Sequence, residues 1–411
     1  MVMIIVIIQP NSNCSRTIYQ LKRGGELEYF LDDQQKMIKE IARNITEERI
    51  KPARAELDEK EEFPWEIVKE IAQADLFRVF IPEEYEGFGA KCLDSCIAIE
   101  ELSRGCCGVS ICYAAVMLGT LPIVLFGSDE MKQKYLPPIA GGERLAAFGL
   151  TESSAGSDAG AMKTQAILDG DEYVINGTKQ FISNGGDAEI YSIIALTNPK
   201  KGVRGASAFV VEKDTPGFTF GKKEKKMGIR CSSTCELVYH NCRVPKENLI
   251  GKEGSGFIAT LKTLDGSRPG VAAQGVGLGQ GALEEAVAYA RQRVQFGQPV
   301  SSFQAVQHMI ADMATQVEAA RLLLYACART IDAGATNYTE DGAMAKLFAT
   351  DMAMKVSTDA VQVFGGAGYC RDYPVEKMMR DAKILQIYEG TNQILRNDII
   401  SHVYKRKAMR P

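Results

Sequence analysis

The sequence predicts an α+β protein in which a helical region is followed by a small antiparallel barrel or sandwich and then by an antiparallel helical bundle. Three observations predict this order. Apolar residues recur at helical spacing over about 28–142, short β-rich runs between turn residues continue to about 249, and alanine-rich helical segments fill about 256–404. The 411 residues also exceed one ordinary core, so we expect two or three domains.

The first 26 residues are expected to form a disordered extension outside the fold. Residues 1–8 are apolar, but this run is far shorter than the ~20 residues that span a bilayer, and it lacks the features of a signal peptide. No later segment looks transmembrane, so we expect no stable membrane insertion. The expected domains are the extension 1–26, a helical domain 27–142, a β domain 143–250 and a helical bundle 251–411.

The first helical domain carries recognisable helix starts. Asp32 precedes a segment in which Ile38 and Ile41 follow helical spacing, and Pro64 suits the first turn of the next helix. Two further helices are expected over 93–102 and 109–126.

The β domain is predicted from strand-like runs with turn residues between them. The expected strands cover residues 173–177, 191–196, 206–211 and 237–239. No long helical pattern separates them, which favours an antiparallel arrangement.

The last domain reads as long helices over 257–293, 303–331, 342–364 and 375–388. The run 277–282 matches a loose dinucleotide fingerprint. A true fingerprint follows a strand and opens a helix, whereas this run lies inside a helical pattern, so we interpret its glycines as close helix packing and infer no nicotinamide site.

Composition excludes several classes of function. The 48 basic and 52 acidic residues are nearly balanced, which argues against nucleic-acid binding. Eleven cysteines in so long a chain suit a reducing cytoplasm rather than a disulfide framework. Cys231, Cys235, His240 and Cys242 match no standard zinc spacing, so we expect no metal. There is no nucleophile-elbow motif to support a hydrolase triad.

The run 387–394, Ile-Tyr-Glu-Gly-Thr-Asn-Gln-Ile, holds the candidate catalytic residue. Glu389 lies between an aromatic residue and Gly390, just before a helical pattern that Thr391 or Asn392 could cap. A carboxylate at such a junction can act as a general base. Taken alone, a solvent-facing glutamate is the more common reading of such a run.

Three further segments contain candidate binding residues. The polar loop 148–158 exposes backbone N–H groups and hydroxyls that can cradle a phosphate or the edge of a planar ring, and an ordinary polar connection explains it equally well. Residues 179–186 could lay Phe181 and Ser183 against a cofactor, although taken alone a strand end and Asn-Gly turn explain them more simply. Asp265 and Arg268 share a helix face as either a surface ion pair or a clamp on an anionic substrate.

Together these segments resemble the acyl-CoA dehydrogenase family of flavoproteins over about residues 28–404. The resemblance rests on five ordered motifs, at 150–158, 291–297, 362–368, 379–383 and 387–394. Bacterial butyryl-CoA and other short- and medium-chain members are the most similar. The implied fold has an N-terminal helical domain, a middle antiparallel β-barrel domain and a C-terminal four-helix bundle, and the implied assembly is a homotetramer.

The resemblance implies FAD as the cofactor and assigns roles by position. The implied FAD contacts are Phe148, Gly149, Leu150, Thr151, Gly156, Ser157, Phe181, Ile182, Ser183, Arg293, Phe296, Gln304, Gln362, Val363, Phe364, Gly365, Gly366, Thr391, Asn392 and Gln393. Of these, the residues from Arg293 to Gly366 are expected to reach the FAD of a neighbouring subunit. The implied contacts to the acyl-CoA substrate are Ser157, Asp265, Arg268 and Gly390.

The implied reaction assigns the base to Glu389. In the family, donors to the thioester oxygen make the α-proton removable, the base takes it, and a β-hydride moves to flavin N5, giving a 2,3-enoyl-CoA. Some branches carry the base at the position of Ser267, but a serine cannot do this work. The expected electron acceptor is an electron-transferring flavoprotein.

The acyl group is the open point. The pocket floor is expected to come partly from 109–118, where small Ala114 and Ala115 and flexible Met117 leave room for a branched or cyclic group such as cyclohexane-1-carboxyl, while an inward Tyr113 would favour short chains. A decarboxylating, glutaryl-CoA-type enzyme is a further alternative, with Arg104 the nearest candidate cation. A non-catalytic flavin-binding protein is the last alternative.

Overall fold

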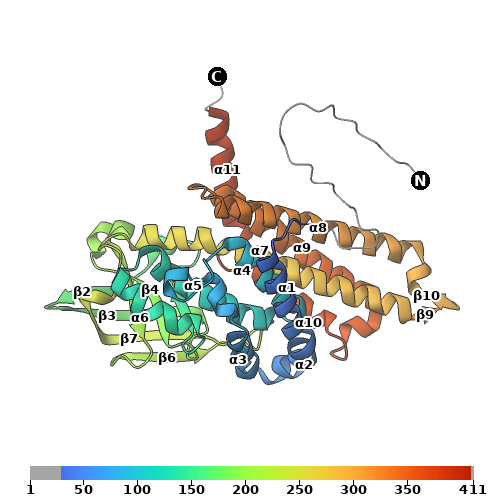
Figure 1. Cartoon of the computed structure of the whole chain (residues 1–411), viewed down its shortest axis with the longest axis horizontal. Coiled ribbons are helices and arrows are strands. Elements are labelled where there is room, and N and C mark those ends of the chain that lie inside the picture. Colours follow the sequence, from blue (N-terminus) through green and yellow to red (C-terminus); the bar gives the residue numbers. More distant parts are fainter. Residues whose placement is uncertain (1–28, 409–411) are drawn as a thin grey trace.

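The computed structural model describes residues 29–408, so the expected extension 1–26 lies outside the described residues. A helical region, a sheet and a second helical region follow one another along the chain, as predicted. Figure 1 shows the sheet at one end of the molecule and a small β9–β10 hairpin at the other, with helix α7 running between them. The four domain boundaries remain predictions.

The first region is helical, as its spacing predicted. Its helices are α1 (Asp33–Ile45), α2 (Lys51–Lys60), α3 (Trp65–Gln73), α4 (Cys92–Gly105), α5 (Cys107–Phe126) and α6 (Asp129–Ala140), with short helical turns at Thr46–Ile50, Leu76–Phe80 and Glu83–Tyr85. The predicted start of α1 is confirmed, because the Asp32 side chain accepts a hydrogen bond from Gln35 N at 2.8 Å and a capping box forms.

The middle region forms one eight-stranded sheet. Its strands are β1 (Ala146–Gly149), β2 (Gln165–Asp169), β3 (Glu172–Ser183), β4 (Ile190–Leu196), β5 (Ala206–Glu212), β6 (Phe218–Lys223), β7 (Thr234–Pro245) and β8 (Leu249–Ile250). All four predicted strands are present, within β3, β4, β5 and β7.

The sheet differs from the expected antiparallel barrel in two ways. Strand β4 pairs in parallel with β1 and with β2. Parallel neighbours need a crossover connection rather than a hairpin turn. Among the described residues the pairing follows the open order β6-β7-β3-β2-β4-β5-β8, and no pairing joins β6 to β8. The sheet is therefore mixed, and barrel closure is not confirmed.

The last region is built on long helices. They are α7 (Gly256–Gln292), α8 (Gln304–Asp332), α9 (Thr339–Phe364), α10 (Val375–Leu385) and α11 (Asn392–Ala408), and the hairpin strands β9 (Val294–Gln295) and β10 (Gln298–Pro299) join α7 to α8. Because the described part of this region has five helices, the expected four-helix bundle is not confirmed as such. In Figure 1, α11 projects from the body.

Helix α7 packs closely on its neighbours, as expected from the glycines of the run 277–282. A Cβ at Gly277 would lie 2.1 Å from Glu100 O, and one at Gly281 would lie 2.3 Å from Arg104 O. These glycines therefore allow the backbones of α7 and α4 to touch, which confirms the packing interpretation.

Helix α5 is the one described helix whose length and composition would allow it to cross a membrane, and 72% of its most apolar window is buried inside the fold. It lies against the sheet, because Ser192 Oγ on β4 donates to Gly119 O on α5 at 2.7 Å. Its apolar character thus corresponds to a core position.

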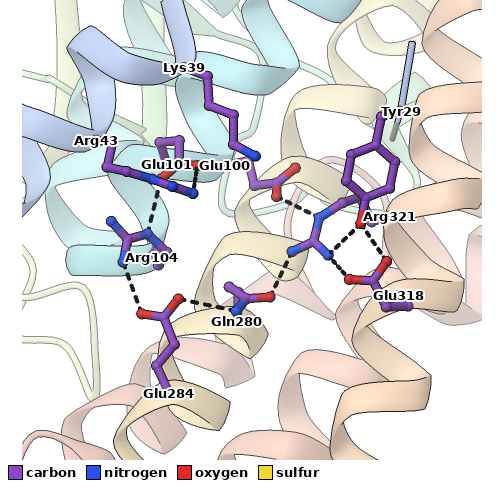
Figure 2. Close-up of a pocket in the computed structure, with 10 residues that line it drawn as sticks. All are labelled: Tyr29, Lys39, Arg43, Glu100, Glu101, Arg104, Gln280, Glu284, Glu318 and Arg321. Atoms are coloured by element: carbon purple, nitrogen blue, oxygen red, sulfur yellow. Dashed lines mark hydrogen bonds and ion pairs between the residues drawn. The ribbon is translucent and has the colours of Figure 1, made fainter. Parts of the chain in front are cut away.

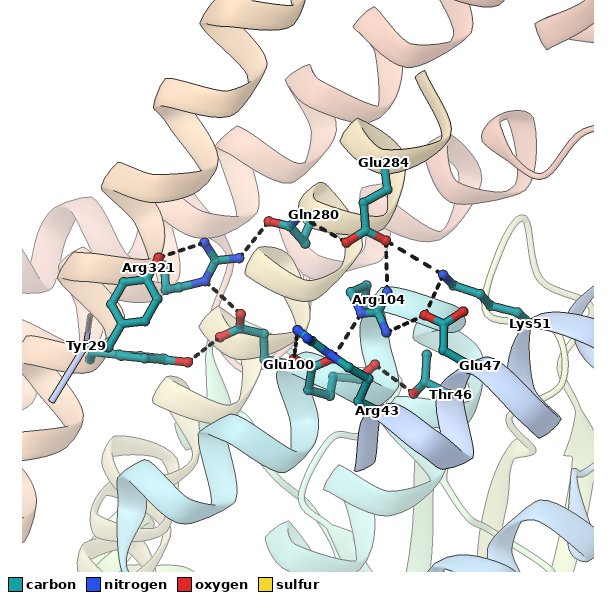
Figure 3. Close-up of polar contacts among 12 residues, drawn as sticks. Tyr29, Arg43, Thr46, Glu47, Lys51, Glu100, Arg104, Gln280, Glu284 and Arg321 are labelled. Carbon is teal, nitrogen blue, oxygen red and sulfur yellow. Dashed lines mark hydrogen bonds and ion pairs between the residues drawn. The ribbon is translucent and has the colours of Figure 1, made fainter. Parts of the chain in front are cut away.

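A buried polar cluster joins α1, α4, α7 and α8. The cluster surrounds a cavity of about 150 Å³. Figure 2 shows its arginines and glutamates facing one another. Arg321 Nε donates to Glu100 Oε1 at 2.8 Å, and Arg104 contacts Glu101 and Glu284. These contacts connect the two helical regions through paired charges (Figure 3).

Candidate active site

Glu389 lies in the short loop between α10 and α11. Its backbone has a φ of +51°, and Gly390 follows at +91°, so two successive residues are left-handed. This turn directs the Glu389 carboxylate towards α7, where Ser267 Oγ donates a hydrogen bond to Glu389 Oε2. Tyr388 is tied to the same helix, since its hydroxyl donates to Gln274 Oε1 at 2.6 Å.

The surroundings of Glu389 favour a carboxylate with altered acidity. Burial raises the pKa of Glu389 above its usual range, while the Ser267 hydrogen bond and the charges of Lys346 and Arg268 act in the opposite direction. A carboxylate whose pKa is raised by burial is a stronger base than an exposed one, which suits it to proton abstraction. The geometry therefore agrees with a general base better than with a solvent-facing glutamate.

Asp265 and Arg268 form a buried pair rather than a surface one. Arg268 Nη1 donates to Asp265 Oδ1 at 3.2 Å and Arg268 Nη2 donates to Asp398 Oδ2 at 3.0 Å. No group in the described residues accepts a hydrogen bond from the buried Nε atom of Arg268. The guanidinium also lies beside the base loop, because its Nη2 is 4.0 Å from a Cβ built on Gly390.

The loop after β1 and the end of β3 lie side by side. Gln180 N donates to Thr151 O at 2.8 Å. Beneath them, fully buried Lys179 donates to Leu150 O at 3.0 Å and pairs with Glu152 at 2.7 Å. The structure thus brings together the two segments that the sequence analysis treated as separate candidates.

These two segments fit the edge of a planar cofactor such as FAD. Phe181 is 57% exposed and left-handed, and apart from its chain neighbours no described residue has an atom within 4 Å of a Cβ built on Gly156, so both sites face open space. Asn184 follows Ser183 and its N donates to Ser233 O at 3.1 Å. In the described part of the chain, the buried Asn184 Oδ1 and Ser233 Oγ have no hydrogen-bond partner. An exposed ring, open backbone and unsatisfied polar atoms are what a bound ring with polar edges would use.

Other expected FAD residues lie elsewhere. Arg293, Phe296 and Gln304 are at or next to the β9–β10 hairpin, at the far end of the molecule from β3 (Figure 1), and Phe296 is 94% exposed. Within this chain they do not meet the Phe181 group.

The residues Gln362–Gly366, which were expected to contact FAD, lie at the end of α9. They are near the point where α7 leads into the β9–β10 hairpin. The Phe364 ring is buried and stacks on Tyr289, whose O accepts a hydrogen bond from Arg293 N at 2.9 Å. The adjacent Gly365 and Gly366 face open space. The glycines are therefore open to a ligand, whereas the phenylalanine packs within the chain.

The three residues after Gly390 differ in their surroundings. Thr391 Oγ1 accepts a hydrogen bond from Ile394 N at 3.2 Å and so caps α11. Asn392 is buried, and its amide donates to Thr350 Oγ1 and Asp351 Oδ1. Gln393 is exposed.

Sequence reasoning missed the polar residues that support these two sites. Ser267 was considered only as an unsuitable base, and Lys346, Lys179 and Glu152 were given no role. Lys346 did leave a signal, because it occupies the spacing of a buried alanine stripe on α9. A charge at such a position needs a partner, and the Gly390 carbonyl provides one.

Two residues considered for the alternative substrates, Arg104 and Tyr113, make contacts within the protein. The Arg104 guanidinium contacts Glu47, Glu101 and Glu284, which leaves it no role as a free cation for decarboxylation. Tyr113 is fully buried against two phenylalanines, and its hydroxyl donates to Leu76 O at 2.8 Å.

The described residues contain no group of three or more histidine, cysteine or acidic side chains that could hold a metal ion.

Comparisons with protein families match nearly the whole chain. The model of the acyl-CoA dehydrogenase N-terminal domain matches residues 32–143, that of the middle domain matches 147–242 and that of the C-terminal domain matches 254–404.

Individual relatives agree with these family matches. The short-chain specific acyl-CoA dehydrogenase of Clostridium acetobutylicum is 47% identical over 380 residues, which cover 92% of this chain and all of the relative. The butyryl-CoA dehydrogenase structure from Megasphaera elsdenii has a TM-score of 0.89 at 43% identity, covering 92% of this chain and 100% of that one. A chain in a structure described as the electron transferring flavoprotein of Acidaminococcus fermentans has a TM-score of 0.89 at 48% identity, covering 94% and 100%.

Proposed function

The chain belongs to the acyl-CoA dehydrogenase family and catalyses acyl-CoA dehydrogenation, and from that premise we propose that Glu389 is the base that removes the α-proton of the thioester. One observation carries this proposal. The Glu389 carboxylate is turned by two left-handed residues onto α7 and is hydrogen-bonded there by Ser267. Such a carboxylate is held in one orientation and partly desolvated, as a base at a carbon acid needs to be.

The chain's own groups account for the proton step. Glu389 takes the α-proton, and its backbone N–H is a donor for the thioester oxygen, on which negative charge develops. Exclusion of water by the substrate raises the basicity of the carboxylate further. FAD, when bound, supplies the acceptor for the β-hydride.

Two groups of residues are proposed to bind the reactants. The loop 148–157 and residues 181–183 hold the flavin ring, which the exposed Phe181 and the open space at Gly156 support. Asp265 and Arg268, with Ser157 and Gly390, bind the acyl-CoA. The unsatisfied Nε of Arg268 supports a contact to this polar ligand.

We propose a short, unbranched acyl group of about four carbons. The short-chain and butyryl-CoA relatives support this choice. The packing beside Ser267 also supports it. One turn further along α7, a Cβ on Gly270 would lie 3.0 Å from Met117 Cε and 3.2 Å from Ile99 Cδ1, so these two side chains fill the adjacent space.

We also propose an assembly, an electron acceptor and a location for the protein. A homotetramer would let the hairpin residues and Gln362–Gly366 reach the FAD of a neighbour, which the 94% exposure of Phe296 supports. An electron-transferring flavoprotein is the proposed electron acceptor. We propose the cytoplasm as the location and keep the predicted domain limits 1–26, 27–142, 143–250 and 251–411.

Anaerobic bleaching of the FAD-loaded protein tests the substrate proposal. Butyryl-CoA is expected to reduce the flavin faster than octanoyl-CoA, isobutyryl-CoA, glutaryl-CoA or cyclohexane-1-carboxyl-CoA. Fastest bleaching by a branched or cyclic thioester would replace the proposed substrate, and release of carbon dioxide from glutaryl-CoA would indicate a decarboxylating enzyme. No bleaching by any of them would contradict catalysis by this site.

A further inference from the structure

Lys346 is a buried cation in an alanine-rich stripe of α9, next to the loop that carries Glu389. Its side chain is 0% exposed, and its neighbours on the same stripe of the helix include Ala343, Ala349 and Ala353. A buried lysine is costly unless its charge and its three donors are satisfied. Its partners therefore indicate what it does.

The first task of Lys346 is to hold the base loop. Its Nζ donates to Gly390 O at 2.8 Å and to Asn392 Oδ1 at 3.0 Å, so one ammonium group spans the turn that follows Glu389. The left-handed backbone of Glu389 is unfavourable for a residue with a side chain and persists only where neighbours enforce it. Lys346 is one such neighbour.

The second task is electrostatic. Both oxygens that Lys346 contacts belong to neutral groups, so its charge acts on the ionisable groups that face it, which are Glu389, Arg268 and Asp351. Arg268 is already paired with two carboxylates, and Asp351 contacts Arg396 at 2.9 Å. Among residues 29–405, the neutral Ser267 hydroxyl is the one side chain that donates a hydrogen bond to the Glu389 carboxylate, so the Lys346 charge is an important part of its environment.

We propose that Lys346 is a positioning residue for proton abstraction, which fixes the peptide that follows Glu389 and supplies the buried positive charge that favours the ionised carboxylate. This inference rests on the proposed function, in which Glu389 is the base. It adds a residue from a different helix that contacts neither the substrate nor the carboxylate directly.

The two groups affect each other's protonation. Burial lowers the pKa of Lys346 to about 7, and the Glu389 charge opposes that shift. Burial raises the pKa of Glu389, and the Lys346 charge opposes that shift in turn. Removal of the lysine charge therefore raises the pKa of Glu389, and the base becomes ionised only at a higher pH.

The test compares FAD-loaded variants by anaerobic stopped-flow reduction with butyryl-CoA between pH 5 and 9. Lys346→Met removes both charge and donors, Lys346→Gln removes the charge but keeps an amide donor, and Lys346→Arg keeps both. Lys355→Met is the matched control, since Lys355 lies on the same helix with a 56% exposed side chain paired to Asp359. Flavin content and thermal unfolding establish that each variant is folded.

In the two neutral variants, the pH at which the rate is half-maximal on the acid side is expected to rise by about one unit. It should stay near the wild-type value in Lys346→Arg and in Lys355→Met. An unshifted profile in Lys346→Gln overturns the inference. So does the failure of both neutral variants to hold flavin, because Lys346 would then serve folding alone. Glu389→Gln distinguishes a failure of this inference from a failure of the proposed function, since fast flavin reduction in that variant would show that Glu389 is not the base.

Discussion

Ser267 and Glu389 join two segments that lie 122 residues apart in the sequence, and their hydrogen bond defines the centre of the site. The octapeptide and the family motifs predicted the carboxylate. They could not predict its serine partner, because nothing local in α7 indicates which of its faces meets the loop. The contact depends on the packing of α7, α9 and α10, which only the folded chain determines.

Ser267→Ala is expected to make Glu389 a weaker acid. The serine hydroxyl donates to the carboxylate and so favours its ionised form, and without it the raised pKa of Glu389 rises further. Activity that needs the ionised base is then lost at a higher pH as the solution is acidified. The acid limb of flavin reduction by butyryl-CoA should move up by roughly half a unit to one unit.

Stopped-flow reduction across pH measures this shift. Ser301→Ala on the connection to α8 serves as the control for loss of a serine hydroxyl. An acid limb that stays in place, or moves down, would mean that the Ser267 hydroxyl does not act on the base.

At the level of elements, the loop after β1 depends on Lys179, which lies outside the loop's own motif at 150–158. Lys179 is buried beneath the loop, where it contacts Leu150 O and Glu152, and Glu152 also accepts from Lys163 N and Thr164 N. The motif alone suggested an ordinary polar connection or a cofactor cradle. The buried pair favours the cradle, because it gives the loop a defined shape.

Lys179→Met is expected to weaken FAD binding and to destabilise the protein. It leaves the Glu152 carboxylate buried without its cation, a change that typically costs about 3–5 kcal/mol. Flavin fluorescence on dilution measures the dissociation constant, and chemical unfolding measures stability. The double variant Lys179→Met with Glu152→Gln should recover part of the loss, whereas additive losses would contradict the pairing.

The contact between Met117 on α5 and Gly270 on α7 leads to a second prediction at this scale. Met117→Ala opens space next to Gly270, so the kcat/KM for longer thioesters is expected to rise relative to that for butyryl-CoA. The ratio of kcat/KM for octanoyl-CoA to that for butyryl-CoA should rise by about tenfold, in line with 1–3 kcal/mol for pocket contacts of this size. Leu118→Ala, half-buried at the neighbouring position, is the control. An unchanged ratio in Met117→Ala would place the end of the acyl pocket elsewhere.

For the whole molecule, the sequence predicted the order of helical, sheet and helical regions but not the sheet's connectivity. Alternating strand patterns identify strands and say nothing about neighbours, so the parallel pairing of β4 with β1 and β2 was missed. The buried charges between α1, α4, α7 and α8 were missed for a related reason. Glu100 and Arg321 look like surface residues until helices distant in sequence bury them together.

Glu100→Gln tests how far that cluster stabilises the fold. Arg321 would lose its buried carboxylate partner, and Tyr325 would lose a charged acceptor, so the free energy of unfolding is expected to fall by about 3 kcal/mol. Glu284→Gln, on a carboxylate that is 37% exposed, should cost less. Equal losses in the two variants, measured by urea unfolding of the FAD-loaded protein, would contradict this ranking.

The most direct test of the account is single-turnover reduction of the flavin in Glu389→Gln by butyryl-CoA. Glutamine keeps the shape of the side chain but cannot accept the α-proton, so the rate should fall by at least about 10³-fold while FAD stays bound. Glu66→Gln, a surface substitution with an 87% exposed side chain, should reduce at the wild-type rate. Reduction of Glu389→Gln within tenfold of wild type would show that another group removes the proton.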